Sequence, residues 1–498
     1  MTPAASLSPA PALSRPGLGG SLALFYAGVA LVHAPLLPSV LQPGMVGRFV
    51  MAGGLLLALQ FAPLEYSLGA LTFGFLAASW APLQNQFQVW RWVLLGAGFL
   101  LLTLRYSLRY RSRRRPRLNP FVGAMLGFVV VSVASVALSP SVPLSAVKLM
   151  ALVCLLLVAH QGGRQLLESY GPAGLRRFVT GQLAFAGGVI AVPIAGYWLS
   201  VGTVVTAKGL FSGYQRNPNA WALMLMLILP WTAAPLLERR PWSIRRYLRA
   251  AVVAILAYSL LLTGSRAGIL GVAVAAAVAA AVHASRRIAA VAILLVVAFC
   301  ARSLADPNFI SAVGERYLVK HREFGVRAAG DDYMLSRAAP WSAARRQFET
   351  RPWMGLGFGI TTERQQHWSL SAETGAGAIE TGSSIWAALL QVGVLGSLCL
   401  FLAVVALLGR GLRFAWRAGD PWFTAVYTSA VALTVNSLFE GWLLAPGSYA
   451  SAYYWLQCFL LNAMMDHFRP APARPAWLAS SPGDASSFSG KCASGSSA

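Results

Sequence analysis

Two short polar segments between apolar runs carry residue types that bind phosphate. The first, residues 213–219 (GYQRNPN), contains Arg216 and Asn219, and its Asn217 and Pro218 suit the N-cap and first position of a helix. A helix N-terminus beside a guanidinium favours a phosphate ligand. The same residues also fit an interfacial cap with an arginine that reaches toward water, and the sequence leaves both interpretations open.

The second segment, residues 263–268 (TGSRAG), forms a turn between two apolar runs with no polar linker. Its two glycines permit close approach of the backbone. Arg266 needs a partner in so apolar a turn, and a lipid-linked diphosphate would satisfy the guanidinium through paired hydrogen bonds, with Ser265 beside it. A structural pairing of Arg266 with a carbonyl or a carboxylate is the alternative.

A third group lies in the longest hydrophilic stretch of the chain. On a helix, Arg337, Trp341, Arg345 and Phe348 would share one face, which we interpret as a substrate-binding face. Pro340 leaves open whether the helix begins there, with Arg337 in its entry loop.

Alternating glycines follow at residues 352–359 (PWMGLGFG). They predict a sharply turning backbone packed against a ligand or the membrane. No strand–glycine–helix pattern surrounds them, so the sequence does not indicate a nucleotide fold.

Two carboxylates lie at predicted membrane edges. Glu380 precedes the apolar run 385–409, where partial desolvation would raise its pKa and suit it to act as a general base. A carboxylate near a helix N-terminus is the structural alternative. Glu440 lies near the outer end of a later apolar run, where it would pair with Arg266 or Arg216 or bind an acceptor sugar.

The composition identifies the elements that must position these residues. Of 498 residues, 57% are hydrophobic and 11% are charged, which excludes a soluble enzyme and a disordered chain. The apolar runs predict an all-α polytopic membrane protein with about twelve to fourteen spans. No metal-ligand cluster or P-loop motif is present in the sequence, so we expect no metal and no cofactor.

The net charge of +24 comes mainly from arginine clusters that recur between spans. Counting spans between the clusters places all of them on one side, which the positive-inside rule makes cytoplasmic, together with both termini. We therefore expect no nucleic-acid partner. The clusters are residues 105–117, 176–177, 239–249, 286–287 and 410–417.

These assignments divide the chain into five parts. We expect a cytoplasmic N-terminal segment, a transmembrane bundle, a large periplasmic loop, a C-terminal set of transmembrane helices and a disordered cytoplasmic tail. They cover residues 1–20, 21–303, 304–382, 383–468 and 469–498.

Taken in order, the motifs resemble those of the O-antigen ligase and O-antigen polymerase family of bacterial envelope proteins. The resemblance covers about residues 120–465. It rests on Arg216 with NPN, on TGSRAG, on a large loop with SRxxxW and PWxGLGFG, and on a span that contains GxLG. Each motif is weak alone, and their order makes the resemblance moderately specific.

The resemblance implies a C-type glycosyltransferase fold and a glycan on undecaprenyl diphosphate as substrate, at the periplasmic face of the bacterial inner membrane. Arg266 and Arg337 match the family's diphosphate-binding arginines, and Arg216 lies at a further basic site. Family members often carry a His-Asn pair before the span that follows the loop. Here that stretch begins at Glu380, and His367 lies thirteen residues earlier, so either residue is a candidate base. Catalysis by activation of the diphosphate alone, without a base, is the third alternative.

The missing His-Asn pair favours a polymerase of repeat units for O-antigen, capsule or exopolysaccharide. A ligase that transfers the polymer to lipid A-core is the alternative, and a lipid-linked sugar flippase or transporter is the second alternative. A transporter would tend to show two related halves, and the sequence shows none. Expected partners are the lipid-linked glycan, the bilayer and possible flippase and chain-length regulator proteins.

Overall fold

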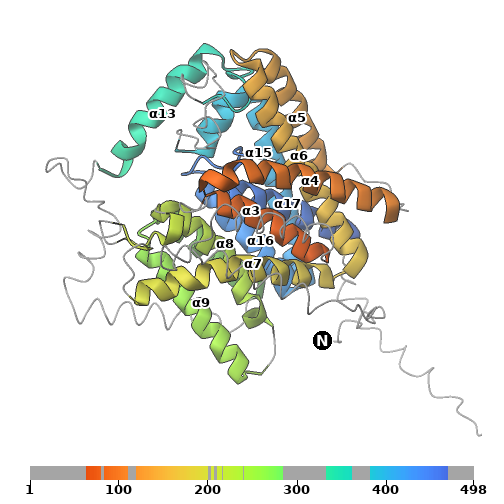
Figure 1. Ribbon diagram of the computed structural model, residues 1–498, viewed down its shortest axis with the longest axis vertical. Coiled ribbons are helices and arrows are strands. Elements are labelled where there is room, and N and C mark those ends of the chain that lie inside the picture. The colour runs from red at the N-terminus through yellow and green to blue at the C-terminus, as the bar shows by residue number, and fades with distance from the viewer. Residues whose placement is uncertain are drawn as a thin grey trace, which may run out of the picture.

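The computed structural model describes an all-α protein over residues 63–79, 84–109, 119–199, 204–206, 210–215, 217–238, 241–283, 332–361 and 382–468. Within these ranges, one isolated β-bridge joins Val205 to Phe211. The helices pack around one another in a single assembly (Figure 1). They are α3 (Leu64–Ala78), α4 (Gln84–Arg109), α5 (Pro120–Ala137), α6 (Val142–Tyr170), α7 (Ala173–Trp198), the 3-10 turn η4 (Gly213–Gln215), α8 (Pro218–Leu237), α9 (Ile244–Leu262), α10 (Arg266–His283), α13 (Asp332–Thr350), α15 (Ser384–Ala418), α16 (Pro421–Ser437) and α17 (Tyr449–His467).

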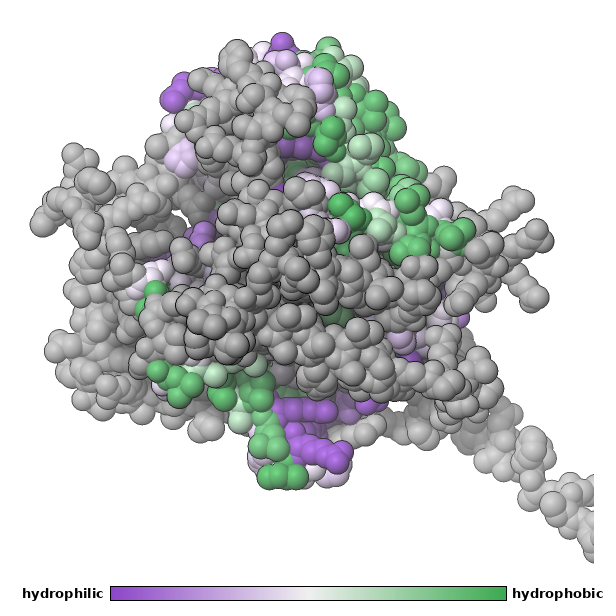
Figure 2. All heavy atoms as spheres, in the orientation of Figure 1, coloured by the Kyte–Doolittle hydropathy of each residue, from purple (hydrophilic) through white to green (hydrophobic). Residues whose placement is uncertain are grey.

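Six of these helices are long and apolar enough to cross a membrane: α5, α6, α7, α8, α10 and α15. Leu126, Val130 and Val133 of α5 are exposed, as expected for side chains that face lipid. Figure 2 shows hydrophobic surface over α5 and α6 and over α9. The polytopic all-α prediction is therefore confirmed, whereas the predicted total of spans stays a prediction because several apolar runs lie outside the described residues.

Helix starts follow the local sequence. Asn119 caps α5, with its Oδ1 accepting from the Val122 N–H at 3.0 Å. Asp420 caps α16, with its carboxylate accepting from the Phe423 N–H at 2.8 Å. Each cap precedes a proline, whose fixed φ suits the first helical position and whose missing N–H has no helical partner to lose.

Contacts between helix ends show that the arginine-rich ends gather together. Arg410 at the end of α15 pairs with Asp466 at the end of α17 at 2.7 Å. The start of α7 meets the start of α16, where Arg176 lies over the Trp422 ring. These contacts place two of the clusters, residues 176–177 and 410–417, at one end of the bundle, here called the basic end, as the sequence predicts.

The opposite end of the bundle, here called the polar end, carries a different set of contacts. Gln215 of η4 donates to the Ser79 hydroxyl at 3.3 Å, and Arg91 of α4 donates to the Gly447 carbonyl at 3.0 Å. Asn219, at the start of α8, lies at the same end. The candidate site residues are built on this end.

Candidate functional site

The N-terminus of α8 forms as the sequence predicts. Asn217 is the N-cap and Pro218 the first helical residue, and the Asn217 Oδ1 accepts from the N–H groups of Asn219 and Ala220 at 3.0 and 3.4 Å. With the backbone N–H of Asn219 thus engaged, its side chain reaches the loop that follows α16. Asn219 Nδ2 donates to Glu440 Oε1 at 3.3 Å. The structure therefore brings together two predicted site residues that are far apart in the sequence.

The turn between α9 and α10 is held by its own side chains. Gly264 takes φ +63°, a left-handed conformation that glycine adopts at little cost. The Ser265 N–H donates to Thr263 Oγ1 at 3.1 Å, and the Ser265 hydroxyl accepts from the Gly268 N–H at 3.4 Å. Ser265 is buried and acts as a cap, so its role here is to fix the first residue of α10, which is Arg266.

Close helix packing sets the position of Arg266. A Cβ on Gly268 would lie 3.1 Å from the Cβ of Ala222 in α8, and a Cβ on Gly271 would lie 2.7 Å from the Ala432 carbonyl oxygen in α16. Small residues at these two contacts let α10 approach both neighbours. Arg266 is half-buried at the end of α10 that adjoins the start of α8.

The start of α15 joins the same region. The Ser384 hydroxyl donates to the Glu440 carbonyl at 2.8 Å and accepts from the Leu443 N–H at 3.2 Å. Ser383 caps α15 through a bond from the Ile385 N–H at 3.2 Å. The loop that carries Glu440 is therefore tied to α15 through its backbone and to α8 through its side chain.

The electrostatics of the polar end favour an anion. Helices α8, α10 and α15 all begin there, and each N-terminus carries a partial positive charge from the helix dipole. Arg266 adds a full positive charge, and Glu440 supplies the carboxylate among them. A cationic site with one carboxylate can bind a diphosphate and still offer a proton acceptor.

Helix α13 lies at the edge of the bundle, and its C-terminal half contacts α15 (Figure 1). It runs from Asp332 through Pro340, so the backbone of Arg337 lies within the helix rather than in an entry loop. Trp341 is half-buried on the same helix. Arg345 is exposed and pairs with Glu349, with 2.9 Å between Nε and Oε1.

The glycine-rich stretch packs against protein within the described structure. Gly355, Gly357 and Gly359 have φ of +73°, +117° and +79°, and a Cβ on each would lie within 2.6 Å of another part of the chain. The predicted sharp turning is confirmed, and the surface that these glycines approach is formed by α6, α15 and the turn between α5 and α6.

Two basic residues at the polar end escaped the sequence reasoning. Arg91 is 5% exposed, lies over Trp92 and donates to the Gly447 carbonyl. Lys148 near the start of α6 donates to the Gly359 carbonyl at 2.7 Å. Each is a basic residue near the start of an apolar run, and that pattern could have identified both.

Three predicted residues lie outside the described part of the chain: Arg216, Glu380 and His367. The side chain of Arg337 also lies outside it. Their roles stay predictions. No group of three or more potential metal ligands occurs among the described residues.

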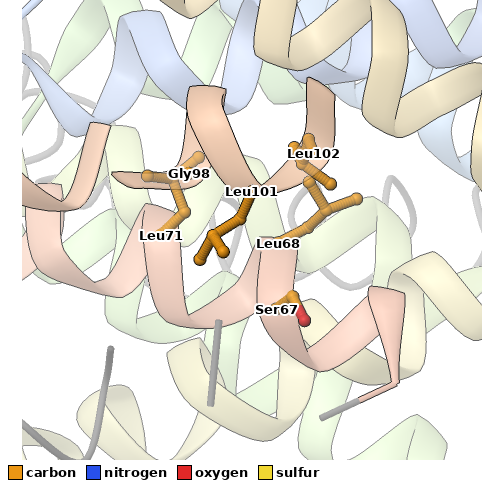
Figure 3. Close-up of a pocket in the computed structure, with 6 residues that line it drawn as sticks. All are labelled: Ser67, Leu68, Leu71, Gly98, Leu101 and Leu102. Carbon is orange, nitrogen blue, oxygen red and sulfur yellow. The ribbon is translucent and has the colours of Figure 1, made fainter. Parts of the chain in front are cut away.

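A small pocket between α3 and α4 is apolar apart from one hydroxyl, so it does not suit a charged ligand (Figure 3). The pocket is lined by Ser67, Leu68, Leu71, Gly98, Leu101 and Leu102.

At the polar end, burial raises the pKa of the Tyr214 phenol, so this group stays protonated at neutral pH.

Comparison with known proteins identifies one family. Residues 251–401 match the family model described as O-antigen ligase. The match covers less than a third of the chain and takes in most of α9, all of α10 and α13, and α15 as far as residue 401. No curated protein matches the chain. The resemblance inferred from the ordered motifs is confirmed over this stretch.

Proposed function

We propose that this membrane protein, with its O-antigen ligase family domain in residues 251–401, polymerises oligosaccharide repeat units carried on undecaprenyl diphosphate. The product would be a surface polysaccharide such as O-antigen, capsule or exopolysaccharide. One observation carries the proposal: three helix N-termini, Arg266 and the Asn219–Glu440 pair lie at the end of the bundle opposite the arginine clusters.

The reaction would be a displacement at the anomeric carbon of the donor sugar. An acceptor hydroxyl oxygen attacks that carbon, the bond to the diphosphate oxygen breaks, and the lipid diphosphate leaves. Arg266, the predicted site residue Arg337 and the helix N-termini would stabilise the negative charge that develops on the leaving group. Attack from the opposite face would invert the anomeric configuration.

The acceptor proton must pass to a base. Glu380 and His367 are the candidates from the sequence, and Glu440 is the carboxylate that the described polar end provides. Glu440 accepts a hydrogen bond from Asn219, which would orient it toward a sugar hydroxyl. The proposed binding face is completed by Trp341 and Arg345 of α13.

The family description favours a second candidate, in which the polymer is transferred to lipid A-core or another acceptor. Both reactions use the same leaving group, so the diphosphate site would serve either. A flippase is less compatible, because three cations of the described helices, Arg91, Lys148 and Arg266, lie toward the polar end rather than along a path through the bundle.

The proposal also assigns an orientation in the membrane. The basic end would face the cytoplasm, with both chain termini, and the polar end would face the periplasm of a bacterial inner membrane. Partners in the same membrane would be a flippase that delivers donor and a protein that regulates chain length.

Arginine substitutions test the site. Arg266→Ala and Arg337→Ala should each lower polymer synthesis by roughly 10²-fold or more, because each removes a donor to the charged leaving group. Protein levels should stay normal. Arg249→Ala is a matched control, because Arg249 is exposed on α9 near the basic end.

Cells that express each variant in a deletion background would be scored for polymer and for lipid-linked intermediates. A polymerase or ligase defect leaves intermediates on the outer face, whereas a flippase defect leaves them inside. Near-normal polymer in both arginine variants would refute the site, and intermediates trapped inside would refute the reaction class.

A further inference from the structure

Helix α15 is interrupted near its polar end. Gly393 takes φ 64° and ψ −167°, a region of backbone conformation that is essentially restricted to glycine. The interruption divides α15 into an outer part, residues 384–392, and an inner part, residues 394–418. Residues 351–361, here called the docked segment, pack into the break.

The docked segment and α5 supply the hydrogen bonds that the broken helix lacks. An unsatisfied backbone group within the hydrocarbon region of a membrane is strongly unfavourable, so these replacement hydrogen bonds stabilise the break. The bonds run from Val394 N–H to Pro352 O (2.8 Å), from Leu395 N–H to Trp353 O (3.4 Å), from Leu356 N–H to Leu390 O (2.7 Å) and from Ser135 Oγ to Gln391 O (2.6 Å).

Glycine is required on both sides of this contact. A Cβ on Gly355 would lie 2.6 Å from the Leu390 carbonyl oxygen, and a Cβ on Gly393 would lie 2.2 Å from the Trp353 carbonyl oxygen. Real Cβ atoms essentially never approach so closely, and backbone atoms cannot turn away as a flexible side chain can. A side chain at either position would push the docked segment off the helix.

Two side chains hold Gly359 in place. The Gly359 N–H donates to Gln391 Oε1 at 2.9 Å, and Lys148 Nζ donates to the Gly359 carbonyl at 2.7 Å. Gln391 is fully buried. Its Oε1 accepts the bond from Gly359, whereas its Nε2 has no hydrogen-bond partner among the described residues. Because burial of a polar side chain costs hydration, the bond to Gly359 is the described side-chain hydrogen bond that offsets this cost, which indicates that Gln391 binds the segment.

A separate hydrophobic cluster joins the docked segment to α13. It includes Ala344 of α13, Leu356 and Ile360 of the segment, and Leu390 of α15, with Leu144 of α6. Phe348 and Trp386 pack against it with ring centroids 6.5 Å apart. The outer part of α15 is thereby connected to the helix that carries the predicted Arg337.

We propose that Gln391 and Lys148 are positioning residues, which hold the docked segment in the break and so set α13 relative to the Ser384–Glu440 contact. Ser384 begins the outer part of α15 and binds the Glu440 carbonyl. Release of the segment would let α13 and its arginines shift away from the polar end. The inference rests on the proposed function, because it places these elements around the same diphosphate site.

Gln391→Met tests the proposal, because it keeps the length of the side chain and removes its acceptor. Lys148→Met removes the second bond to Gly359 from another helix. We expect both variants to lower kcat roughly tenfold, since misplacement by about 1 Å can cost 10²-fold in rate, and to leave the KM for lipid-linked donor within about twofold. Gly409→Ala, in the same helix as Gln391, is the control, because a Cβ at residue 409 would meet no atom within 4 Å.

Hydrogen–deuterium exchange of the purified protein in nanodiscs gives a readout that needs no activity. The amides of Leu356 and Gly359 should exchange faster in both methionine variants, while those of residues 400–415 stay as protected as in the wild type. Unchanged exchange would overturn the docking role of the two side chains. Faster exchange with unchanged kcat would overturn the positioning role.

The two proposals fail in different ways. If Arg266→Ala keeps full activity while Gln391→Met shows faster exchange and lower kcat, the proposed diphosphate site is wrong and the positioning role stands for a site elsewhere. If Arg266→Ala is inactive and Gln391→Met matches the wild type in both assays, the positioning proposal alone is wrong.

Discussion

The substitution Gly271→Ala should displace Arg266 while leaving the arginine itself unchanged. The added Cβ would lie 2.7 Å from the Ala432 carbonyl oxygen, whereas ordinary contact begins at 3.4 Å, so α10 and α16 must separate by about 0.7 Å. The same Cβ would lie 3.3 Å from the Met226 sulfur, so a shift of α10 toward Met226 is also restricted. A steric insertion of one methyl group into a packed contact costs about 1–3 kcal/mol of stability.

The functional cost follows from the position of Arg266 on the same helix, about one and a half turns before Gly271. A displacement approaching 1 Å at a reacting site can lower a rate by about 10²-fold, so we expect polymer synthesis to fall roughly tenfold or more. The assay would measure turnover of lipid-linked donor by protein in nanodiscs, with the melting temperature measured on the same samples.

Gly123→Ala in α5 provides the matched control. A Cβ there meets no atom within 4 Å, and alanine in an open helical position stabilises by about 0.4–1 kcal/mol. We expect normal turnover from this variant. Equal turnover in Gly271→Ala and Gly123→Ala would refute the reasoning that close packing of α10 positions the active arginine.

Three further substitutions separate binding, charge and stability at the polar end. Glu440→Gln keeps an acceptor for Asn219 and removes the charge, so we expect turnover to fall about 10²-fold with an unchanged melting temperature; unchanged turnover would exclude Glu440 as base. Asn219→Leu removes the donor to Glu440 and should cost about 1–3 kcal/mol, read as a lower melting temperature. Arg345→Ala breaks an exposed pair with Glu349, so stability should change by less than about 0.5 kcal/mol, and lower turnover from it would report a contact with substrate.

Local features of the fold follow from the sequence. Asn217 and Pro218 start α8 because a cap and a preset φ act within one turn of the chain. The turn before Arg266 is likewise fixed by neighbours, through Gly264 and Ser265. The arginine clusters also predicted which helix ends gather, because charge bias acts on each span separately.

Features that depend on packing could not be predicted in the same way. The expected pairing of Glu440 with an arginine or a sugar stays a prediction, and the sequence does not indicate the hydrogen bond from Asn219, on a helix more than two hundred residues earlier in the chain. Pro340 suggested a helix start, yet α13 continues through it. A proline removes one hydrogen bond, and the flanking turns of α13 persist around that loss.

The glycine motifs illustrate a third limit. PWMGLGFG and the glycine of the next span were recognised separately, but their relation depends on Gly393 opening a helix that the segment then enters. No local sequence pattern predicts which distant backbone N–H and C=O groups a turn will hydrogen-bond. The roles of Lys148 and Gln391 likewise depend on Gly359, because both side chains bind its backbone.

The most direct test of the proposed function is a reaction with purified protein in nanodiscs and labelled undecaprenyl-diphosphate repeat units, with no added metal or nucleotide. The account predicts a ladder of polymer from donor alone in the wild type, and loss of the ladder in Arg266→Ala. Transfer only to an added lipid A-core acceptor would identify a ligase instead. A full ladder from Arg266→Ala would contradict the central claim that the polar end of α10 binds the diphosphate.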